Sequence, residues 1–232
     1  MESVTKNLPF TIRVGKEETI TLNKRRNNMK ELGGKKMALT KDQIQEKINE
    51  VLETGMWMIR RSNNGASCHN GFQWAPIGEW TVAPDWNPVK ECGGGLHGNG
   101  PLSKGHWANG RDIDFCAVEN VVDIDGEKIK CEKAMVLLRN ELPYIKSFVG
   151  DFNVSGCDLS NIKLPESIGG YLNVSGCDLS NVKFPESIGG YLDVSGCDLS
   201  NIKLPESIGG SIYASGCDLS GIKLQNNIHI IQ

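Results

Sequence analysis

Hydrophobic residues recur along the last third of the chain with a fixed period of 20 residues. The second copy contains the pattern Leu-x-Val-x-x-Cys-x-Leu and ends in Gly-Gly, and the other copies match it closely, although the fourth lacks the Gly-Gly end. Alternating apolar positions predict a short strand with one face turned inward, and the period predicts one coil per copy. A single coil cannot bury its own apolar face, so the copies must stack. We therefore predict a parallel β solenoid over residues 146–232, built from four repeats and closed by a C-terminal cap.

The pattern differs over residues 37–145, where one helical segment precedes several short apolar segments. Thr40 and Gln43 have the spacing of a capping box, and the chain meets Gly55 after four apolar residues at helical spacing, Ile44, Ile48, Val51 and Leu52. This pattern predicts a helix over 38–54 whose apolar stripe faces the core.

Two hairpins are predicted in the segment that follows the helix. The first joins 71–74 to 79–83 through Pro-Ile-Gly, and the second joins 115–124 to 128–138 through Asp-Gly. Together with the helix they indicate a small α+β domain. Residues 1–36 are polar and basic, and we interpret them as a leader without a stable fold. Whether this leader belongs to the natural protein stays open.

The charge and composition of the chain narrow the classes of protein to which it can belong. The chain has 232 residues, 39% hydrophobic and 23% charged, with a net charge of −3. Residues 151–232 contain four lysines against nine aspartates and glutamates, so the repeats are acidic. We therefore expect no nucleic-acid partner. No apolar run reaches the roughly 20 residues that span a bilayer, so we expect no membrane contact.

Half of the eight cysteines fall on one repeat position, namely Cys157, Cys177, Cys197 and Cys217. A strict period favours buried packing positions over disulfides. We therefore expect a reducing, cytoplasmic setting. Four thiolates in one column cannot surround a tetrahedral ion, and the remaining cysteines and histidines lack paired metal-ligand spacing, so we expect no metal and no cofactor.

The repeats resemble the short bacterial kind of leucine-rich repeat over residues 148–232. The four cysteines take the Asn/Cys position of that family's pattern, and its Leu-Pro position is taken by Leu164-Pro165, Phe184-Pro185 and Leu204-Pro205. The resemblance implies a parallel sheet whose strand face is exposed. Four repeats would give it little curvature.

Two strand positions vary most among the otherwise similar copies, and both should point outward. They place five protein-binding candidates on the strand face, which are Tyr171, Asn173, Tyr191, Asp193 and Tyr213. Aromatic side chains are common anchors of protein interfaces. Drift at exposed positions after duplication would give the same variation, and both interpretations stay open.

Residues 84–98 read Pro-Asp-Trp-Asn-Pro-Val-Lys-Glu-Cys-Gly-Gly-Gly-Leu-His-Gly. This stretch resembles the signature PDWxPxxxCGGGLHG of an uncharacterised domain of bacterial and phage proteins, and the similarity covers about 56–140. The resemblance implies an accessory role in host interaction or defence, without naming a reaction.

The same stretch contains candidates for binding a ligand. Backbone amides of a glycine loop can hold phosphate, histidine and aspartate supply acid–base groups, and tryptophan can stack on a base. The candidates are Asp85, Trp86, Gly93, Gly94, Gly95, His97 and His106. They would suit a nucleotide or an ADP-ribose-like ligand. The alternative is a purely structural glycine turn under Trp86, and no catalytic residue is assigned.

The sequence is compatible with two functions. The first is a non-enzymatic bacterial or phage accessory factor that binds a protein through the strand face of the repeats. The second is a domain that binds or processes a nucleotide-like ligand at the glycine loop. Neither the partner nor the oligomeric state is fixed, and self-association stays open.

Overall fold

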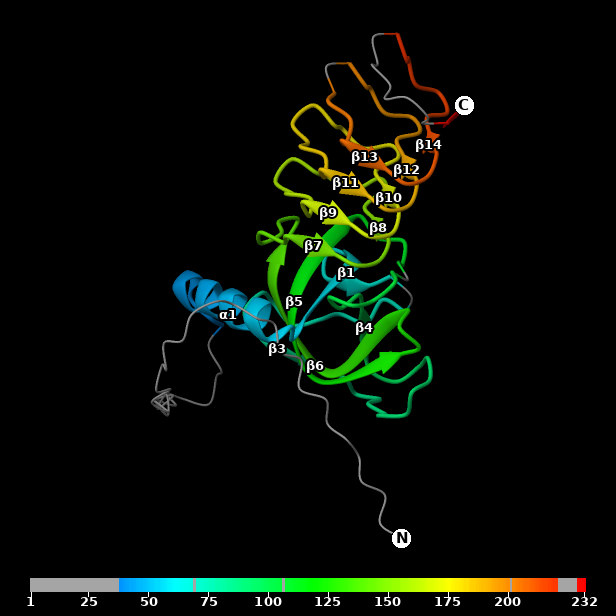
Figure 1. Cartoon of the computed structure of the whole chain (residues 1–232). Helices are drawn as coiled ribbons and strands as arrows, with labels where there is room; N and C mark the ends of the chain where they lie inside the picture. Colours follow the sequence, from blue (N-terminus) through cyan, green and yellow to red (C-terminus); the bar gives the residue numbers. More distant parts are fainter. Residues whose placement is uncertain (1–37, 69, 106, 201, 221–228) are drawn as a thin grey trace, which may run out of the picture. The chain divides into compact units, whose positions relative to one another are not determined.

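The computed structural model describes residues 38–68, 70–105, 107–200, 202–220 and 229–232 (Figure 1). The predicted leader, His106 and the Gln225–Asn227 part of the predicted C-terminal cap lie outside the described residues. The described part contains one helix, an antiparallel sheet and a β solenoid. The N-terminal domain, expected as a small α+β domain with one helix, is mostly β with a single helix.

Helix α1 (Lys41–Thr54) confirms the helix predicted from the sequence. Both halves of the capping box form, because the Thr40 hydroxyl accepts from the amide of Gln43 and the Gln43 side chain accepts from the amide of Thr40. Gly55 ends the helix with a φ of 71°. Ile48 and Val51 are buried, so the apolar stripe faces the core as expected.

The N-terminal domain is organised around one sheet of six strands, whose path is β2-β1-β5-β6-β3, with β4 also paired to β6. Its strands are β1 (Trp57–Asn63), β2 (Ala66–Ser67), β3 (Trp80–Val82), β4 (Leu96–Gly98), β5 (Asp112–Ile124) and β6 (Lys128–Arg139). The β5–β6 hairpin confirms the Asp-Gly prediction. Asp125 and Gly126 have left-handed φ of 53° and 73°, and the chain reverses over residues 125–127, between Ile124 and its partner Lys128.

The first predicted hairpin is wrong. Segment 79–83 contributes β3, but β3 pairs with β6 and not with the segment before it. Gln73 forms only an isolated bridge with Ala66. The chain does turn at Pro-Ile-Gly. β3 nevertheless pairs with β6, because β6 offers a longer strand than residues 71–74, and this partner lies far away in the sequence.

Both faces of the sheet are covered, because alternate residues of β5 enter two different cores. Phe115 and Ala117 belong to the cluster shared with α1. Cys116 and Val118 belong to a second cluster with Trp74. A strand buried on both faces reads as a continuous apolar run, which explains why Phe-Cys-Ala-Val shows no alternation.

The C-terminal region is a parallel β solenoid of about four turns, which confirms the predicted stacking. One stack contains β7 (Ser147–Phe148), β9 (Ser167–Ile168), β11 (Ser187–Ile188) and β13 (Ser207–Ile208). The other contains β8 (Phe152–Asn153), β10 (Leu172–Asn173), β12 (Leu192–Asp193), β14 (Ile212–Tyr213) and β15 (Ile230–Ile231). Matching residues lie in register, for example Leu172 opposite Leu192.

Glycine recurs at two positions of the repeat, and each position requires glycine for a different reason. Gly169, Gly189 and their equivalents lie at the corner between the two stacks, where a Cβ on Gly189 would overlap the carbonyl oxygen of Gly169. Gly176 instead has a φ of 66° and open space around its missing Cβ. The first column is needed for close approach of neighbouring coils and the second for a left-handed turn.

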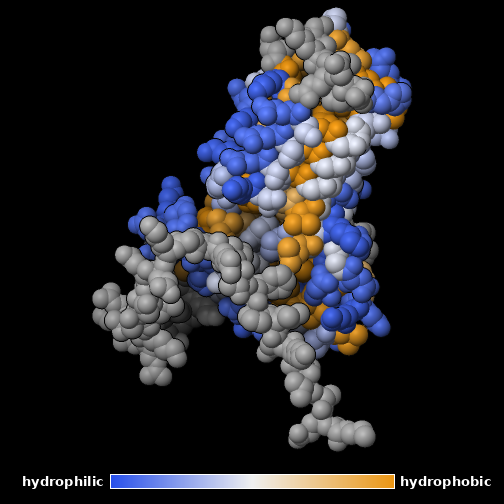
Figure 2. Space-filling view, viewed as in Figure 1, coloured by the Kyte–Doolittle hydropathy of each residue, from blue (hydrophilic) through white to orange (hydrophobic). Residues whose placement is uncertain are grey.

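The repeated cysteines are buried in the solenoid, as predicted. Cys157, Cys177 and Cys197 belong to the core, and Cys217 in the last coil is partly exposed. The Sγ atoms of Cys177 and Cys197 lie 3.2 Å from the carbonyl oxygens of Val154 and Val174, one coil earlier. Figure 2 shows the outer consequence of this repetition, because columns of residues of like hydropathy run from coil to coil.

Arg61 and Trp107 of the N-terminal domain bind the backbone on either side of β8, the first strand of its stack. The carbonyl oxygen of Asp151 accepts from Trp107 Nε1 at 2.7 Å, and that of Ser155 accepts from Arg61 Nη2 at 2.5 Å. In later coils the residue equivalent to Ser155 accepts from the amide of the preceding coil, as Ser175 does from Gly156. At these two carbonyl groups the domain therefore takes the place of a preceding coil.

One hydrophobic cluster runs from α1 through the sheet into the coils, from Ile48 to Ala214. At the junction, Phe148 and Phe152 contact edge to face with centroids 5.2 Å apart, and Trp107 packs on both rings. Within the described ranges, the chain has no helix long and apolar enough to cross a membrane.

Candidate functional site

The glycine loop borders a cavity of about 670 Å³, within the usual range for small-molecule sites. Most of its lining comes from residues 67, 68, 70 and 72, from 92–99, and from 107–109, and the rest from Arg60, Arg61, Pro84, Asp85 and Lys128. Of the sequence candidates, the cavity is lined by Asp85, Gly93, Gly94, Gly95 and His97. His106 lies outside the described residues.

The loop itself has a conformation that only glycine adopts readily. Gly93, Gly94 and Gly95 all have positive φ, at 106°, 56° and 113°. The buried ammonium of Lys130 donates to the carbonyl oxygens of Glu91 and Gly93, each at 2.9 Å. These bonds fix the loop from beneath and satisfy a charge that is only 1% exposed.

Asp85 and Trp86 both contact the loop at Gly95. The amide of Gly95 donates to Asp85 Oδ1 at 3.0 Å. A Cβ on Gly95 would lie 3.1 Å from the ring of Trp86, which packs against the second core. Trp86 is not among the cavity-lining residues, so the structure places it under the loop and not beside a ligand. His97 lines the cavity from β4, where it pairs with Lys130.

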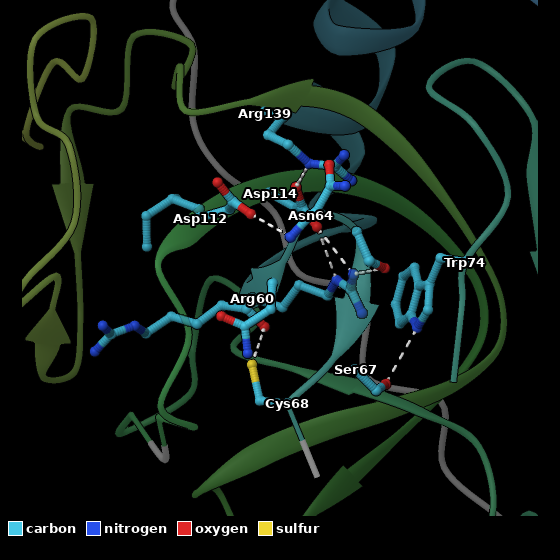
Figure 3. A network of polar contacts seen from close by, with 12 residues as sticks. Arg60, Asn64, Ser67, Cys68, Trp74, Asp112, Asp114 and Arg139 are labelled. Atoms are coloured by element: carbon cyan, nitrogen blue, oxygen red, sulfur yellow. Dashed lines mark hydrogen bonds and ion pairs between the residues drawn. The ribbon is translucent and has the colours of Figure 1, made fainter. Parts of the chain in front are cut away.

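Arg60 enters the cavity wall from a buried ionic network (Figure 3). Its Nε donates to Asp114 Oδ2 at 3.0 Å, and Arg139 Nε donates to the other oxygen at 2.7 Å. The Arg60 guanidinium also stacks 3.5 Å over the ring of Trp74. Asp114 is fully buried, so the two arginines are needed to offset its desolvation.

Arg61, the next residue, lines the same cavity and also reaches the solenoid. Its guanidinium donates to the carbonyl oxygen of Gly110. It also donates to Asn153 Oδ1, to the hydroxyl of Ser155 and to the carbonyl oxygen of Ser155. All these acceptors are neutral. The side chain of Arg61 therefore both lines the cavity and binds the solenoid.

Lys128 and Cys92 form a polar pair in the cavity wall. The Lys128 ammonium lies 3.3 Å from Cys92 Sγ, and Cys92 is exposed. Among the residues that the structure describes, no carboxylate lies within ion-pair distance of Lys128.

A second candidate site follows the outer side of the β8–β15 stack, where the tyrosines form a ladder. The rings of Tyr171 and Tyr191 are stacked, with centroids 4.6 Å apart and planes at 12°. Tyr213 contacts Tyr191 edge to face at 5.2 Å. We call these three residues the tyrosine ladder. Because two faces are hidden in the stack, the ladder offers mainly ring edges and hydroxyls to a partner.

The two other strand-face candidates use their side chains within the repeats. Asn173 Oδ1 accepts from the amide and the hydroxyl of Ser175, at 2.9 and 2.7 Å. Asp193 Oδ1 accepts from the amide of Ser195 at 3.0 Å, and its second oxygen accepts from Asn173 at 3.2 Å. The structure thus assigns both residues turn-stabilising contacts on the face where the tyrosines lie.

The hydroxyls of Tyr171 and Tyr191 remain protonated at neutral pH. Partial burial raises the pKa of Tyr171, with the nearby Asp151 as a further cause. Burial likewise raises the pKa of Tyr191. Both phenols are therefore available as hydrogen-bond donors to a partner. No group of three or more His, Cys, Asp or Glu side chains that could hold a metal ion occurs in the described part of the chain.

Sequence reasoning did not find Arg60, Arg61, Lys128 or Trp107. One signal was available, because Arg60-Arg61 directly follows the apolar Trp57-Met-Ile run. Two arginines inside such a strand need acceptors or a ligand. Lys128 gave no signal, since its approach to Cys92 depends on how the loop folds back onto β6.

Residues 56–146 match the family model described as a domain of unknown function, DUF7666. The match includes the cavity-lining residues and ends before the solenoid strands. No curated protein and no solved structure matches the chain.

Proposed function

We propose that the protein is a non-enzymatic binding protein whose tyrosine ladder contacts a protein partner. The observation that carries this proposal is the continuous ladder of Tyr171, Tyr191 and Tyr213 on one face of a solenoid. Tyrosine combines apolar area with a hydroxyl donor at low entropic cost, which is why it is enriched at interfaces.

The scaffold behind the ladder supports this role. Leu172 and Leu192, which flank the tyrosines in sequence, are fully buried, so the strands that present the ladder are anchored in the core. The first coil is bound to the N-terminal domain through Arg61 and Trp107. A fixed array of anchors loses little conformational entropy when a partner binds.

The proposal also assigns the repeats to the leucine-rich repeats. Strands occur at the Leu-x-Val position and cysteines at the Asn/Cys position, as in the leucine-rich repeats that the sequence resembles. A bacterial or phage accessory role rests on the resemblance of the N-terminal domain alone. The partner would then be a host or competitor protein.

The test uses binding with a matched control. The double variant Tyr171→Ala/Tyr191→Ala removes the stacked pair, whereas Tyr144→Ala removes a tyrosine that is 64% exposed outside the ladder. A partner isolated with the wild-type protein should be retained by Tyr144→Ala and lost by the double variant, with thermal unfolding showing that both variants fold. Equal retention by all three proteins would refute the proposal.

The cavity favours a second candidate function, binding of a nucleotide-like ligand. Five of the seven sequence candidates converge on it, and its volume suits a mononucleotide or a somewhat larger ligand. A thermal shift with ADP-ribose or ADP that disappears in His97→Ala would support this function. The absence of any shift or calorimetric signal with either compound would argue against it.

A further inference from the structure

The cavity carries an excess of positive charge in an acidic protein. Its lining contains three cationic side chains, Arg60, Arg61 and Lys128, against one carboxylate, Asp85. The whole chain has a net charge of −3. Arg60 is held by Asp114, but Arg61 contacts only neutral oxygens and Lys128 contacts a thiol. Such a lining attracts an anion.

The glycine loop adds donors that the fold leaves unused. The Gly95 amide is taken by Asp85, whereas the amides of Gly93 and Gly94 donate to no acceptor in the described part of the chain. Both glycines line the cavity. Because Lys130 fixes the loop carbonyls, these amides need no ordering when an anion binds.

The rest of the lining indicates more than a bare ion. Phe72, Leu96 and Trp107 supply apolar surface to the same cavity. A phosphate alone would leave these side chains uncovered, whereas a nucleotide can place an aromatic ring against them and its phosphate near the loop.

We propose that the cavity binds the phosphate of a nucleotide-like ligand through the Lys128 ammonium and the amides of Gly93 and Gly94. This inference rests on the second candidate function and specifies its chemistry. Binding draws the Lys128 ammonium toward the phosphate and away from Cys92 Sγ, 3.3 Å away. The ligand also covers the exposed Cys92 thiol, which lines the same wall.

Two readouts on the full-length protein test the proposal, calorimetry and the rate of Cys92 alkylation by iodoacetamide. ADP should bind and slow the alkylation, and adenosine at equal concentration should bind at least about tenfold more weakly because it lacks the charge-assisted bonds. Pyrophosphate, which lacks the ring, should bind more weakly than ADP.

Matched lysine variants locate the phosphate. Lys128→Ala should weaken ADP binding by about tenfold or more and leave adenosine binding unchanged. Lys133→Ala is the control, since Lys133 lies on the same strand β6, pairs with Glu119 and does not line the cavity. Lys128→Arg should keep much of the affinity.

The outcomes separate the two claims. If ADP and adenosine bind equally, or if Lys128→Ala binds ADP like the wild-type protein, the phosphate site is wrong although the cavity still binds a ligand. If none of the three compounds binds or protects Cys92, both the phosphate site and the ligand-binding function are overturned.

Discussion

The Sγ atom of Cys177 lies 3.2 Å from the carbonyl oxygen of Val154, so the thiol of one coil donates to the backbone of the coil before it. Cys197 repeats the contact with Val174. In the first coil, Cys157 Sγ lies 3.8 Å from the carbonyl oxygen of Gly110, a residue of the N-terminal domain. The cysteine column thus marks both the stacking of the coils and the place where the domain substitutes for a coil.

This arrangement predicts selective alkylation of the cysteines. Burial raises the pKa of Cys157 to about 11 and that of Cys131 to about 12, and it also raises the pKa of Cys177. At pH 8 these thiols should stay protonated and unreactive, whereas the exposed Cys92 should react with iodoacetamide first. Mass spectrometry of digested samples gives the rate at each site.

Cys92→Ser provides the control, because it should remove the fast phase and leave the slow one unchanged. Labelling of Cys157 or Cys177 at the rate of Cys92 in the native protein would contradict the buried column and with it the stacked solenoid.

The two glycine columns predict different costs for the same substitution. Gly189→Ala places a Cβ onto the carbonyl oxygen of Gly169, so neighbouring coils must separate, and we expect a loss of about 3 kcal/mol or more in the free energy of unfolding. Gly176→Ala meets open space and is destabilised only by its left-handed backbone, at a cost of about 1–2 kcal/mol.

Urea unfolding followed by circular dichroism measures both variants against the wild-type protein. Equal losses for the two variants would mean that close approach of the coils is not what selects glycine at residue 189.

The sequence predicted those parts of the structure that are local or repeated. The 20-residue period gave the stacking, the Thr40–Gln43 spacing gave the helix start, and Asp125-Gly126 gave the β5–β6 turn. Each of these signals depends on residues close together in sequence or on a pattern seen several times.

The parts that sequence reasoning missed depend on distant contacts. Arg61 acquires its role only when strand pairing brings residues 110 and 155 beside it. The predicted pairing of β3 with residues 71–74 was wrong for the same reason, since β3 pairs with the distant strand β6 instead. At the candidate site the glycine loop was found, but its cationic surroundings come from β1 and β6, far along the chain.

Arg61 should be essential for the junction between the domain and the solenoid. Arg61→Ala removes the guanidinium donor from the carbonyl oxygens of the buried Gly110 and the partly buried Ser155, and we expect a loss of about 3 kcal/mol in the free energy of unfolding. Arg111→Ala, at an exposed position, should change it by less than about 0.5 kcal/mol.

Hydrogen exchange distinguishes a local loss of stability at the junction from a general loss over the whole protein. In Arg61→Ala the amides of the first coil, around Phe152 to Cys157, should exchange faster, with a smaller change in the third coil. A uniform increase over all coils would show that Arg61 stabilises the protein as a whole and does not specifically cap the solenoid.

The aspartate that follows each repeated cysteine should make stability depend on acid pH. In every coil this carboxylate accepts a hydrogen bond from the amide two residues later, as Asp178 does from Ser180 at 2.9 Å. These bonds lower the pKa of Asp158, Asp178, Asp198 and Asp218, with the serine amide or hydroxyl as the main cause.

A carboxyl group with a lowered pKa in the folded state stabilises the protein above its unfolded pKa, near 3.8, and loses this contribution as the pH falls through the folded value. The wild-type protein should therefore lose thermal stability below about pH 4. Asp178→Asn keeps an oxygen acceptor for Ser180 but cannot titrate, so the difference in melting temperature between the two proteins should shift in favour of the variant between pH 5 and pH 2.5. A difference that stays constant over this range would show that the Asp178 carboxylate does not contribute through its charge. Measuring Asp178→Asn against the wild-type protein at each pH cancels the other titrating groups, including Asp151, whose pKa is raised by burial and which acts in the opposite direction.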